Sequence, residues 1–261
     1  MGSAVVDRTR GTRDLWTYRV AGGAATRLTT SESDENWMIW SADGTRAIIN
    51  AFDRTAFGLF ELPLGLAGTR RRLVADDVAR WPVSVSPDAR FLLFVSNAQA
   101  TGNDIWVLPL SGSQRAYPFQ RTEAAENWAT FSPDGRYVAF SSSERGTAEV
   151  YVTPFPGPGP KWRVSDGTGT QTRWRQPTEL VYLDGTRRLV AVTLRIGAAA
   201  VEVTRAAPLF EIEYPYGAYH AFDVSTDGRR IIVARTIAQG GGSTVVRLDT
   251  TTPTLDPRST R

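Results

Sequence analysis

The stretch Phe131-Ser132-Pro133-Asp134-Gly135-Arg136, followed at once by the apolar run Tyr137-Val138-Ala139-Phe140, decides the fold of this chain. Proline presets φ, aspartate tolerates a left-handed backbone and glycine adopts positive φ freely, so the stretch predicts a tight turn between two strands. The apolar runs on both sides of the turn are typical of strands that are buried on both faces.

The same turn recurs along the chain at a nearly constant period of about 45 residues. The copies are Ser41-Ala42-Asp43-Gly44, Ser86-Pro87-Asp88-Ala89, Ser132-Pro133-Asp134-Gly135 and Ser225-Thr226-Asp227-Gly228. The interval before the last copy is about twice as long as the others and leaves room for one more turn. We place a degenerate copy at Arg175-Gln176-Pro177-Thr178, which has lost the Asp-Gly pair.

A second marker with the same period predicts a third strand in each repeat. It reads Asp14-Leu15-Trp16, Gly58-Leu59-Phe60, Asp104-Ile105-Trp106 and Glu149-Val150-Tyr151. A more polar fourth strand follows, as in Lys161-Trp162-Arg163-Val164. Four strands in about 45 residues are the signature of a propeller blade.

We therefore predict an all-β chain that forms one β-propeller domain of four-stranded antiparallel blades over residues 1–261. Six blades with an incomplete first blade are favoured, and five blades are the alternative. The predicted limits are 1–29 for the partial first blade, 36–75, 80–121, 127–165 and 171–211 for full blades, and 219–249 for the last blade. Since the first blade starts in its middle, we expect the sequence to be the end of something longer.

Composition narrows the chemistry that the chain can perform. There is no cysteine, and His220 is the one histidine, so thiolate sites, histidine-rich metal sites and a cysteine nucleophile are excluded. A Ser-His-Asp triad would need His220, and no Gly-x-Ser-x-Gly elbow is present to hold a serine. We predict no catalytic residue, no metal and no cofactor.

Acidic residues leave calcium as an alternative, because Ca²⁺ takes carboxylate oxygens. The turn aspartates already have a sufficient role in the turns. The other acidic residues precede predicted blades, and we interpret them as parts of solvated loops: Asp34, Glu35, Asp76, Asp77, Glu123 and Glu126.

The charge pattern indicates which classes of partner the chain could bind. The formal net charge is +3, and the basic residues are scattered rather than gathered on one segment, so nucleic acid is not predicted as a partner. No apolar run approaches 18 residues, so we predict no membrane contact by this chain. We also predict that the chain is a monomer.

The strongest candidate site is positional. Polar and aromatic residues lie at the start of each predicted innermost strand, which in a propeller surrounds a central channel. They are Asn36, Trp37, Arg80, Trp81, Asn127, Trp128, Arg173, Tyr219 and His220. Polar groups beside aromatic rings at a concavity are what a ligand site requires, so we predict ligand binding at the channel mouth. The alternative is that the tryptophans pack between blades and the polar groups are only solvated.

In its repeated turns and the apolar strands that follow them, the sequence resembles the TolB-like propeller family, whose repeats carry the Ser-Pro-Asp-Gly turn before an apolar strand. A narrower resemblance follows the order Asp104–Leu110, Phe131–Arg136, Glu149–Gly157 and Trp162–Ser165. It is to the C-terminal propeller of bacterial serine/threonine protein kinases and related regulators. That resemblance implies an extracytoplasmic location. The chain itself has no Gly-rich phosphate loop, His-Arg-Asp loop or Asp-Phe-Gly.

The predicted function is a non-catalytic binding or sensing module for a protein, a peptide or a small ligand. It would be the C-terminal part of a larger bacterial regulator such as a serine/threonine kinase. The alternatives are a propeller hydrolase and the gating propeller of a peptidase. The fold alone does not separate them.

Overall fold

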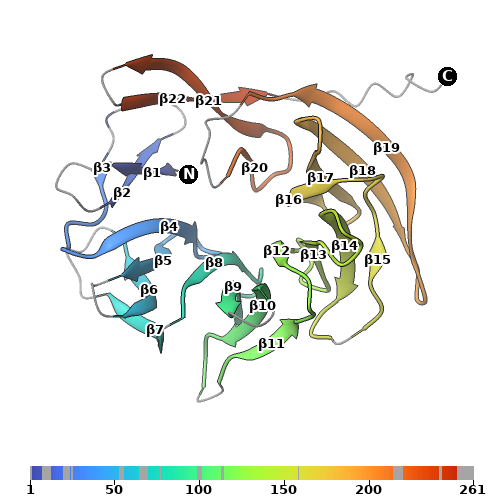
Figure 1. Ribbon diagram of the computed structural model, residues 1–261, viewed down its shortest axis with the longest axis horizontal. Helices are drawn as coiled ribbons and strands as arrows, with labels where there is room; N and C mark the ends of the chain where they lie inside the picture. The colour runs from blue at the N-terminus through green and yellow to red at the C-terminus, as the bar shows by residue number, and fades with distance from the viewer. Residues whose placement is uncertain are drawn as a thin grey trace. The chain divides into compact units, whose positions relative to one another are not determined.

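The computed structural model of the 261-residue chain describes residues 2–7, 13–19, 24, 26–52, 56–64, 70–76, 78–98, 102–112, 115–157, 159–213, 220–240 and 243–251. All regular elements in these ranges are β-strands, and they form six antiparallel sheets (Figure 1). None of the described residues forms a helix long and apolar enough to cross a membrane. The chain divides into two compact units, residues 1–129 and 130–261.

The first unit contains three sheets in chain order. They are β1 (Gly2–Asp7), β2 (Asp14–Arg19) and β3 (Thr26–Arg27); then β4 (Asp34–Trp40), β5 (Arg46–Phe52), β6 (Phe57–Pro63) and β7 (Arg71–Asp76); then β8 (Arg80–Val85), β9 (Phe91–Ala98), β10 (Gly102–Pro109) and β11 (Tyr117–Gln120). Each strand pairs with the next along the chain, which is the meander of a propeller blade. The described part of the first sheet has three strands, and the limits 1–29 of a partial first blade stay a prediction.

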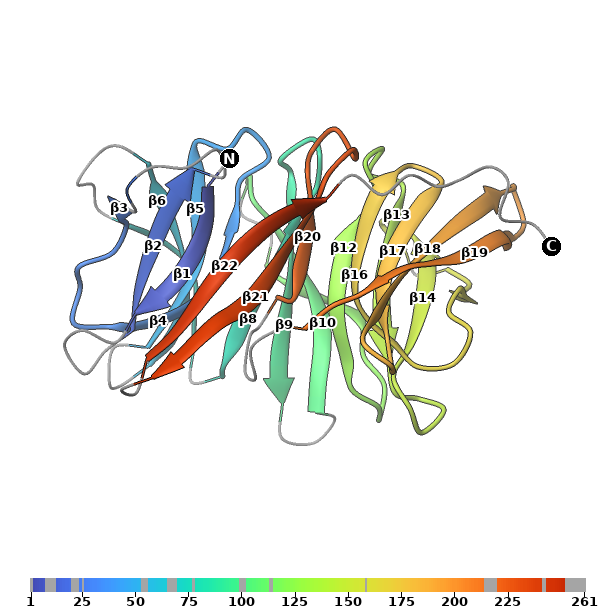
Figure 2. The same cartoon turned by 90° about the horizontal axis from the view of Figure 1, so that it is seen from above.

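The second unit continues the same pattern. Its sheets are β12 (Glu126–Phe131, which begins just before the boundary), β13 (Tyr137–Ser142), β14 (Glu149–Pro154) and β15 (Trp162–Arg163); then β16 (Gly169–Gln176), β17 (Glu179–Asp184), β18 (Arg188–Ile196) and β19 (Val201–Glu211); then β20 (Phe222–Val224), β21 (Ile231–Gly240) and β22 (Ser243–Thr251). Figure 2 shows β21 and β22 as a long antiparallel pair beside the short β20. The described part of this last sheet has three strands.

The repeated turn has one hydrogen-bond pattern that explains its sequence. In the copy after β4, the Ser41 hydroxyl donates to Asp43 Oδ1 at 2.6 Å, and the backbone N–H of Arg46 donates to Ser41 Oγ at 3.0 Å. Gly44 closes the turn at φ 69° with its N–H on the Ser41 carbonyl, 2.9 Å away. The Ser41 hydroxyl and the Thr45 backbone N–H hold the pKa of Asp43 well below its usual range. The turn aspartates therefore act as acceptors within their own turns.

The same bonds recur at the other turns. Ser86 donates to Asp88, Ser132 to Asp134 and Ser225 to Asp227, at 2.6, 2.6 and 2.5 Å. Where glycine is missing, Ala89 adopts the left-handed conformation itself, at φ 58°. The degenerate copy also makes a turn, because Pro177 and Thr178 separate β16 from β17.

The core of each unit lies between neighbouring sheets. In the first unit, Ile48 and Leu59 of one sheet pack with Leu92, Phe94 and Leu108 of the next. In the second unit, an apolar cluster joins Val150 and Val152 to Leu180 and Val192. These are the continuous apolar runs of the second and third strands, which confirms their prediction as strands buried on both faces. The limits of a single propeller domain over 1–261 stay a prediction.

The third-strand marker makes an ion pair that the repeat pattern does not predict. Its acidic residue pairs with an arginine from the fourth-strand segment, so Asp14 meets Arg27 at 2.5 Å and Glu149 meets Arg163 at 2.8 Å. Both acids are buried. A buried carboxylate needs such a partner, and the pair ties the outermost strand to its sheet.

Candidate functional site

Two strand-start residues of the first unit, Trp37 and Trp128, place their aromatic rings next to each other. The rings of Trp37 in β4 and Trp128 in β12 have centroids 5.8 Å apart and planes tilted by 35°. The spacing lies in the range preferred by aromatic pairs. Trp37 is buried and Trp128 is half-buried. Each lies four residues before the first residue of its turn, so the repeat places them equivalently.

Trp128 has an unusual backbone. Its φ is +58°, in the left-handed region that bulky residues seldom adopt. The other strand-start residue of this kind, Gln171 in β16, has φ +52° at the same distance before its own turn. Such conformations cost about 1–3 kcal/mol, persist only where the surroundings enforce them, and cluster at functional sites. In Trp128 this conformation accompanies the ring contact with Trp37.

The amide of Asn127, beside Trp128, belongs to a chain of amides. Asn97 Nδ2 donates to Asn103 Oδ1 at 2.6 Å, and Asn103 Nδ2 donates to Asn127 Oδ1 at 2.7 Å. In β4, the backbone N–H of Asn36 donates to Asn50 Oδ1 at 3.4 Å. The amide chain orients the Asn127 side chain, since its carbonyl oxygen is already taken by Asn103.

Arg80 and Trp81 begin β8. The Arg80 guanidinium lies over the ring of Phe94, 5.2 Å from its centroid, and Trp81 is half-buried opposite Val95 in the register. A cation over an aromatic face is held in place without losing its charge. The first unit thus holds aromatic, amide and cationic groups at the starts of three strands.

Arg173 and His220 form a separate group in the second unit. Arg173 Nε donates to Asp223 Oδ1 at 2.8 Å, Nη1 donates to the Thr172 carbonyl at 2.8 Å, and Nη2 lies 2.7 Å from His220 Nδ1. Gln171 accepts the backbone N–H of Ala221 at 2.8 Å. Tyr219 lies outside the described residues.

The guanidinium sets the state of His220. Since Arg173 can only donate, Nδ1 must accept, and the ring is neutral with its proton on Nε2. Burial, together with the Arg173 charge, lowers the pKa of His220 well below 6.5. In this state His220 carries no free lone pair on either nitrogen.

The interpretation of Glu35 and Glu126 as parts of solvated loops is wrong. Both carboxylates are buried, whereas Glu123 is exposed as expected. Thr122 donates its hydroxyl to Glu126 Oε1 at 2.5 Å, and Ser31 donates to Glu35. Burial raises the pKa of Glu35, although the Ser31 hydroxyl and the Arg70 charge oppose the shift. The signal was the sequence Glu-Asn-Trp, which occurs at 35–37 and again at 126–128.

The remaining acidic residues divide in the same way. Asp34 is half-buried and paired with Arg13 through both carboxylate oxygens. The side chains of Asp76 and Asp77 lie outside the described residues. Across the described part of the chain, no three histidine or acidic side chains gather in a group that could hold a metal ion.

Known proteins share this fold. The structure of TolB from Acinetobacter baumannii superposes with a TM-score of 0.68 at 16% identity, over 95% of this chain and 60% of that one. An oligogalacturonate lyase in complex with manganese superposes with a TM-score of 0.63 at 12% identity, over 94% of this chain and 70% of that one. The chain has the TolB-like β-propeller fold that the sequence predicts. Both a TolB and an enzyme are among these neighbours, and fold does not choose between binding and catalysis.

Sequence comparison gives a shorter match. A segment of 93 residues is 32% identical to the putative tricorn protease homolog 2 of Streptomyces coelicolor, covering 34% of this chain and 8% of that relative. No family model matches the chain. The chain therefore spans a small part of the curated relative and less than two thirds of the TolB structure.

Proposed function

We propose that this TolB-like propeller chain is a non-catalytic binding or sensing module for a protein, a peptide or a small ligand. The single observation that carries the proposal is the group formed by Trp37, Trp128 and Asn127. It combines a tilted aromatic pair, a strained backbone at Trp128 and an amide held in one orientation. Rigid aromatic anchors beside oriented polar groups are typical of binding surfaces.

The state of His220 supports a non-catalytic role. A general base needs a free lone pair near the proton that it removes. The Nδ1 of His220 faces the Arg173 guanidinium, and Nε2 carries the ring proton, so the one histidine of the chain is poorly suited to this task. Some of the described carboxylates are also committed, Asp43 to its own turn and Glu149 to Arg163.

The chain would belong to a larger protein. We propose that the chain acts as the sensing part of a larger extracytoplasmic regulator such as a serine/threonine kinase, without nucleic acid, metal or cofactor, and as a monomer. The order of the repeat motifs over residues 104–165 is the feature that supports this assignment.

A second candidate is a propeller that gates access to a peptidase. It is favoured by the match over 93 residues to a tricorn protease homolog. In that case the same strand-start residues would contact passing peptides only weakly, and cleavage would need another domain.

The test is a panel of peptides and oligosaccharides added to the purified chain, with calorimetry reporting binding and mass spectrometry reporting turnover. We expect a ligand that binds and is recovered unchanged. Trp128→Ala should abolish the signal, whereas Trp162→Ala, a half-buried tryptophan of β15, serves as the matched control. Conversion of any panel compound by the isolated chain would contradict the non-catalytic assignment.

A gating propeller would give a different result in the same assay. Peptides of many sequences would bind with similar weak affinity, and Trp128→Ala would reduce all of them alike. A defined ligand that binds far more tightly than the rest of the panel would favour the sensing module.

A further inference from the structure

A pocket in the first unit involves none of the strand-start residues. It lies between the sheet β4–β7 and the sheet β8–β11, at the ends of β4 and β8, where the chain enters its turns. Its volume is about 130 Å³, and its lining is Ser41, Arg46, Ile48, Glu61, Arg71, Val85, Ala89, Arg90, Leu110 and Ser111.

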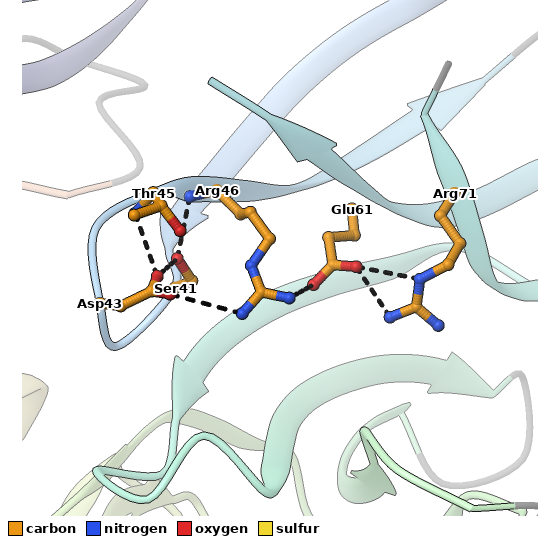
Figure 3. A network of polar contacts seen from close by, with 6 residues as sticks. All are labelled: Ser41, Asp43, Thr45, Arg46, Glu61 and Arg71. Atoms are coloured by element: carbon orange, nitrogen blue, oxygen red, sulfur yellow. Dashed lines mark hydrogen bonds and ion pairs between the residues drawn. The ribbon is translucent and has the colours of Figure 1, made fainter. Parts of the chain in front are cut away.

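The rim of the pocket carries more positive than negative charge. The lining contains three arginines, Arg46, Arg71 and Arg90, and one acidic residue, Glu61. Arg46 Nη1 donates to Glu61 Oε1 at 2.9 Å, and Arg71 donates through Nε and Nη2 to Glu61 Oε2 at 2.9 and 2.8 Å (Figure 3). Glu61 therefore shows, within the chain, how these arginines receive a carboxylate.

Arg90 completes the rim without taking part in this network. Its closest ion pair is with Asp88, at 4.0 Å, and its side chain is 69% exposed. The nearest competing carboxylate on the other side is Asp43, 3.6 Å from Arg46 and already bound by its own turn. Arg90 thus retains hydrogen-bonding capacity for an anion from outside.

The base of the pocket is apolar. Ile48 is buried, and Val85 and Leu110 pack on the same core cluster between the two sheets. An inorganic anion would leave this surface without a partner. A ligand with an aliphatic group next to its acid would cover this surface and gain affinity by removing it from water.

We propose that this pocket binds a small organic carboxylate with an aliphatic side chain, such as the free carboxyl terminus of a peptide ending in leucine or valine. Guanidinium groups match the geometry of a carboxylate, and the apolar base matches the side chain. The volume is below the roughly 300–1,000 Å³ of pockets for drug-sized molecules, which limits the occupant to one such residue.

The first test is calorimetric titration of the full chain with N-acetyl-leucine. The controls are N-acetyl-leucinamide, which lacks the charge, acetate, which lacks the side chain, and inorganic phosphate. We expect N-acetyl-leucine to bind at least tenfold more tightly than each control. Equal binding of phosphate or acetate would make this a general anion site and overturn the proposal, as would no binding at all.

Variants of the rim give predictions of opposite sign. Arg90→Gln should weaken N-acetyl-leucine binding at least fivefold without changing the melting temperature, because Arg90 lies outside the Glu61 network. Glu61→Gln should strengthen binding several-fold, since it releases Arg46 and Arg71 from their internal carboxylate. Arg195→Gln, an exposed arginine paired with Glu202 in the other unit, is the control. Unchanged binding in Arg90→Gln, or weaker binding in Glu61→Gln, would contradict the proposal.

Discussion

The strand-start residues of the two units use the same position of the repeat in different ways. In the first unit, Trp37 and Trp128 place two indole rings against each other, and Asn127 is oriented by a neighbouring amide. In the second unit, the three side-chain nitrogens of Arg173 hydrogen-bond to Asp223, the Thr172 carbonyl and His220. The first group brings aromatic rings together, whereas the second uses its donors on its own acceptors, so we propose a binding role for the first group and a structural role for the second.

The largest expected effect on stability concerns a turn of the second unit. Gly228 has φ +70°, and a Cβ at this position would lie 2.3 Å from the Arg175 carbonyl oxygen. Gly228→Ala must therefore shift backbone in the turn that follows β20, and we expect a loss of about 3 kcal/mol of unfolding free energy. Urea denaturation measures it.

Gly146 is the matched control for this change, because it also has positive φ in the second unit but meets nothing within 4 Å. Gly146→Ala should cost about 1 kcal/mol, which is the backbone strain alone. Equal losses in the two variants would mean that the turn does not press on Arg175.

Arg173→Ala should cost about 2 kcal/mol of unfolding free energy, because it removes the hydrogen bonds that Arg173 makes with the Thr172 carbonyl and with His220 Nδ1. The exposed ion pair with Asp223 adds little to this loss. The pKa of His220 should rise, since the neighbouring positive charge is removed. Proton NMR of the imidazole, followed from pH 4 to 8, reports the titration, and an unchanged pKa would contradict the contact.

The pH dependence of stability follows from the same histidine. In the unfolded chain, His220 takes up a proton near pH 6.5, whereas in the folded chain its pKa is well below this value. Below pH 6.5 the unfolded state therefore binds more protons than the folded state. The contribution of neutral His220 to the unfolding free energy is complete above pH 6.5 and is lost as the pH falls below it.

Relative to His220→Gln, the wild-type chain should lose up to about 1.4 kcal/mol of unfolding free energy per pH unit between pH 6.5 and 5. Denaturant melts of both proteins at several pH values provide the difference, which removes the contributions of the carboxylates. Parallel curves would show that His220 titrates normally in the folded protein.

The smallest effect concerns the first group. Asn103→Ala removes the donor that orients Asn127 and should cost about 1 kcal/mol of unfolding free energy. In free energy, Asn103→Ala should also lower the affinity for the panel compound that binds the wild type by more than it lowers the stability of the fold. Asn97 lies one step further along the amide chain and is exposed, so Asn97→Ala is the control that should change neither quantity by more than a few tenths of a kcal/mol.

The fold was predictable because its signal is local. The repeated turn makes its hydrogen bonds within five residues, as in Ser132-Pro133-Asp134-Gly135, and its period of about 45 residues is visible without any structure. The degenerate turn at Pro177 could be placed only because the others define the period.

Parts of the candidate site could not be predicted from the sequence, because the residues that contact each other there are distant along the chain. Glu35 is buried with Arg70, 35 residues away, so its loop composition was misleading. Arg173 meets His220 and Asp223 across 47 and 50 residues, and nothing in its neighbourhood announces this. The positive φ of Trp128 has no sequence signal, because tryptophan seldom takes it.

The decisive measurement is the affinity of the wild-type chain, Trp128→Ala and Arg173→Ala for the compound of the peptide and oligosaccharide panel that binds the wild type, determined by calorimetry. We expect Trp128→Ala to lose at least tenfold in affinity and Arg173→Ala to stay within twofold of the wild type. The reverse pattern, with binding retained in Trp128→Ala and lost in Arg173→Ala, would contradict the assignment of binding to the first unit.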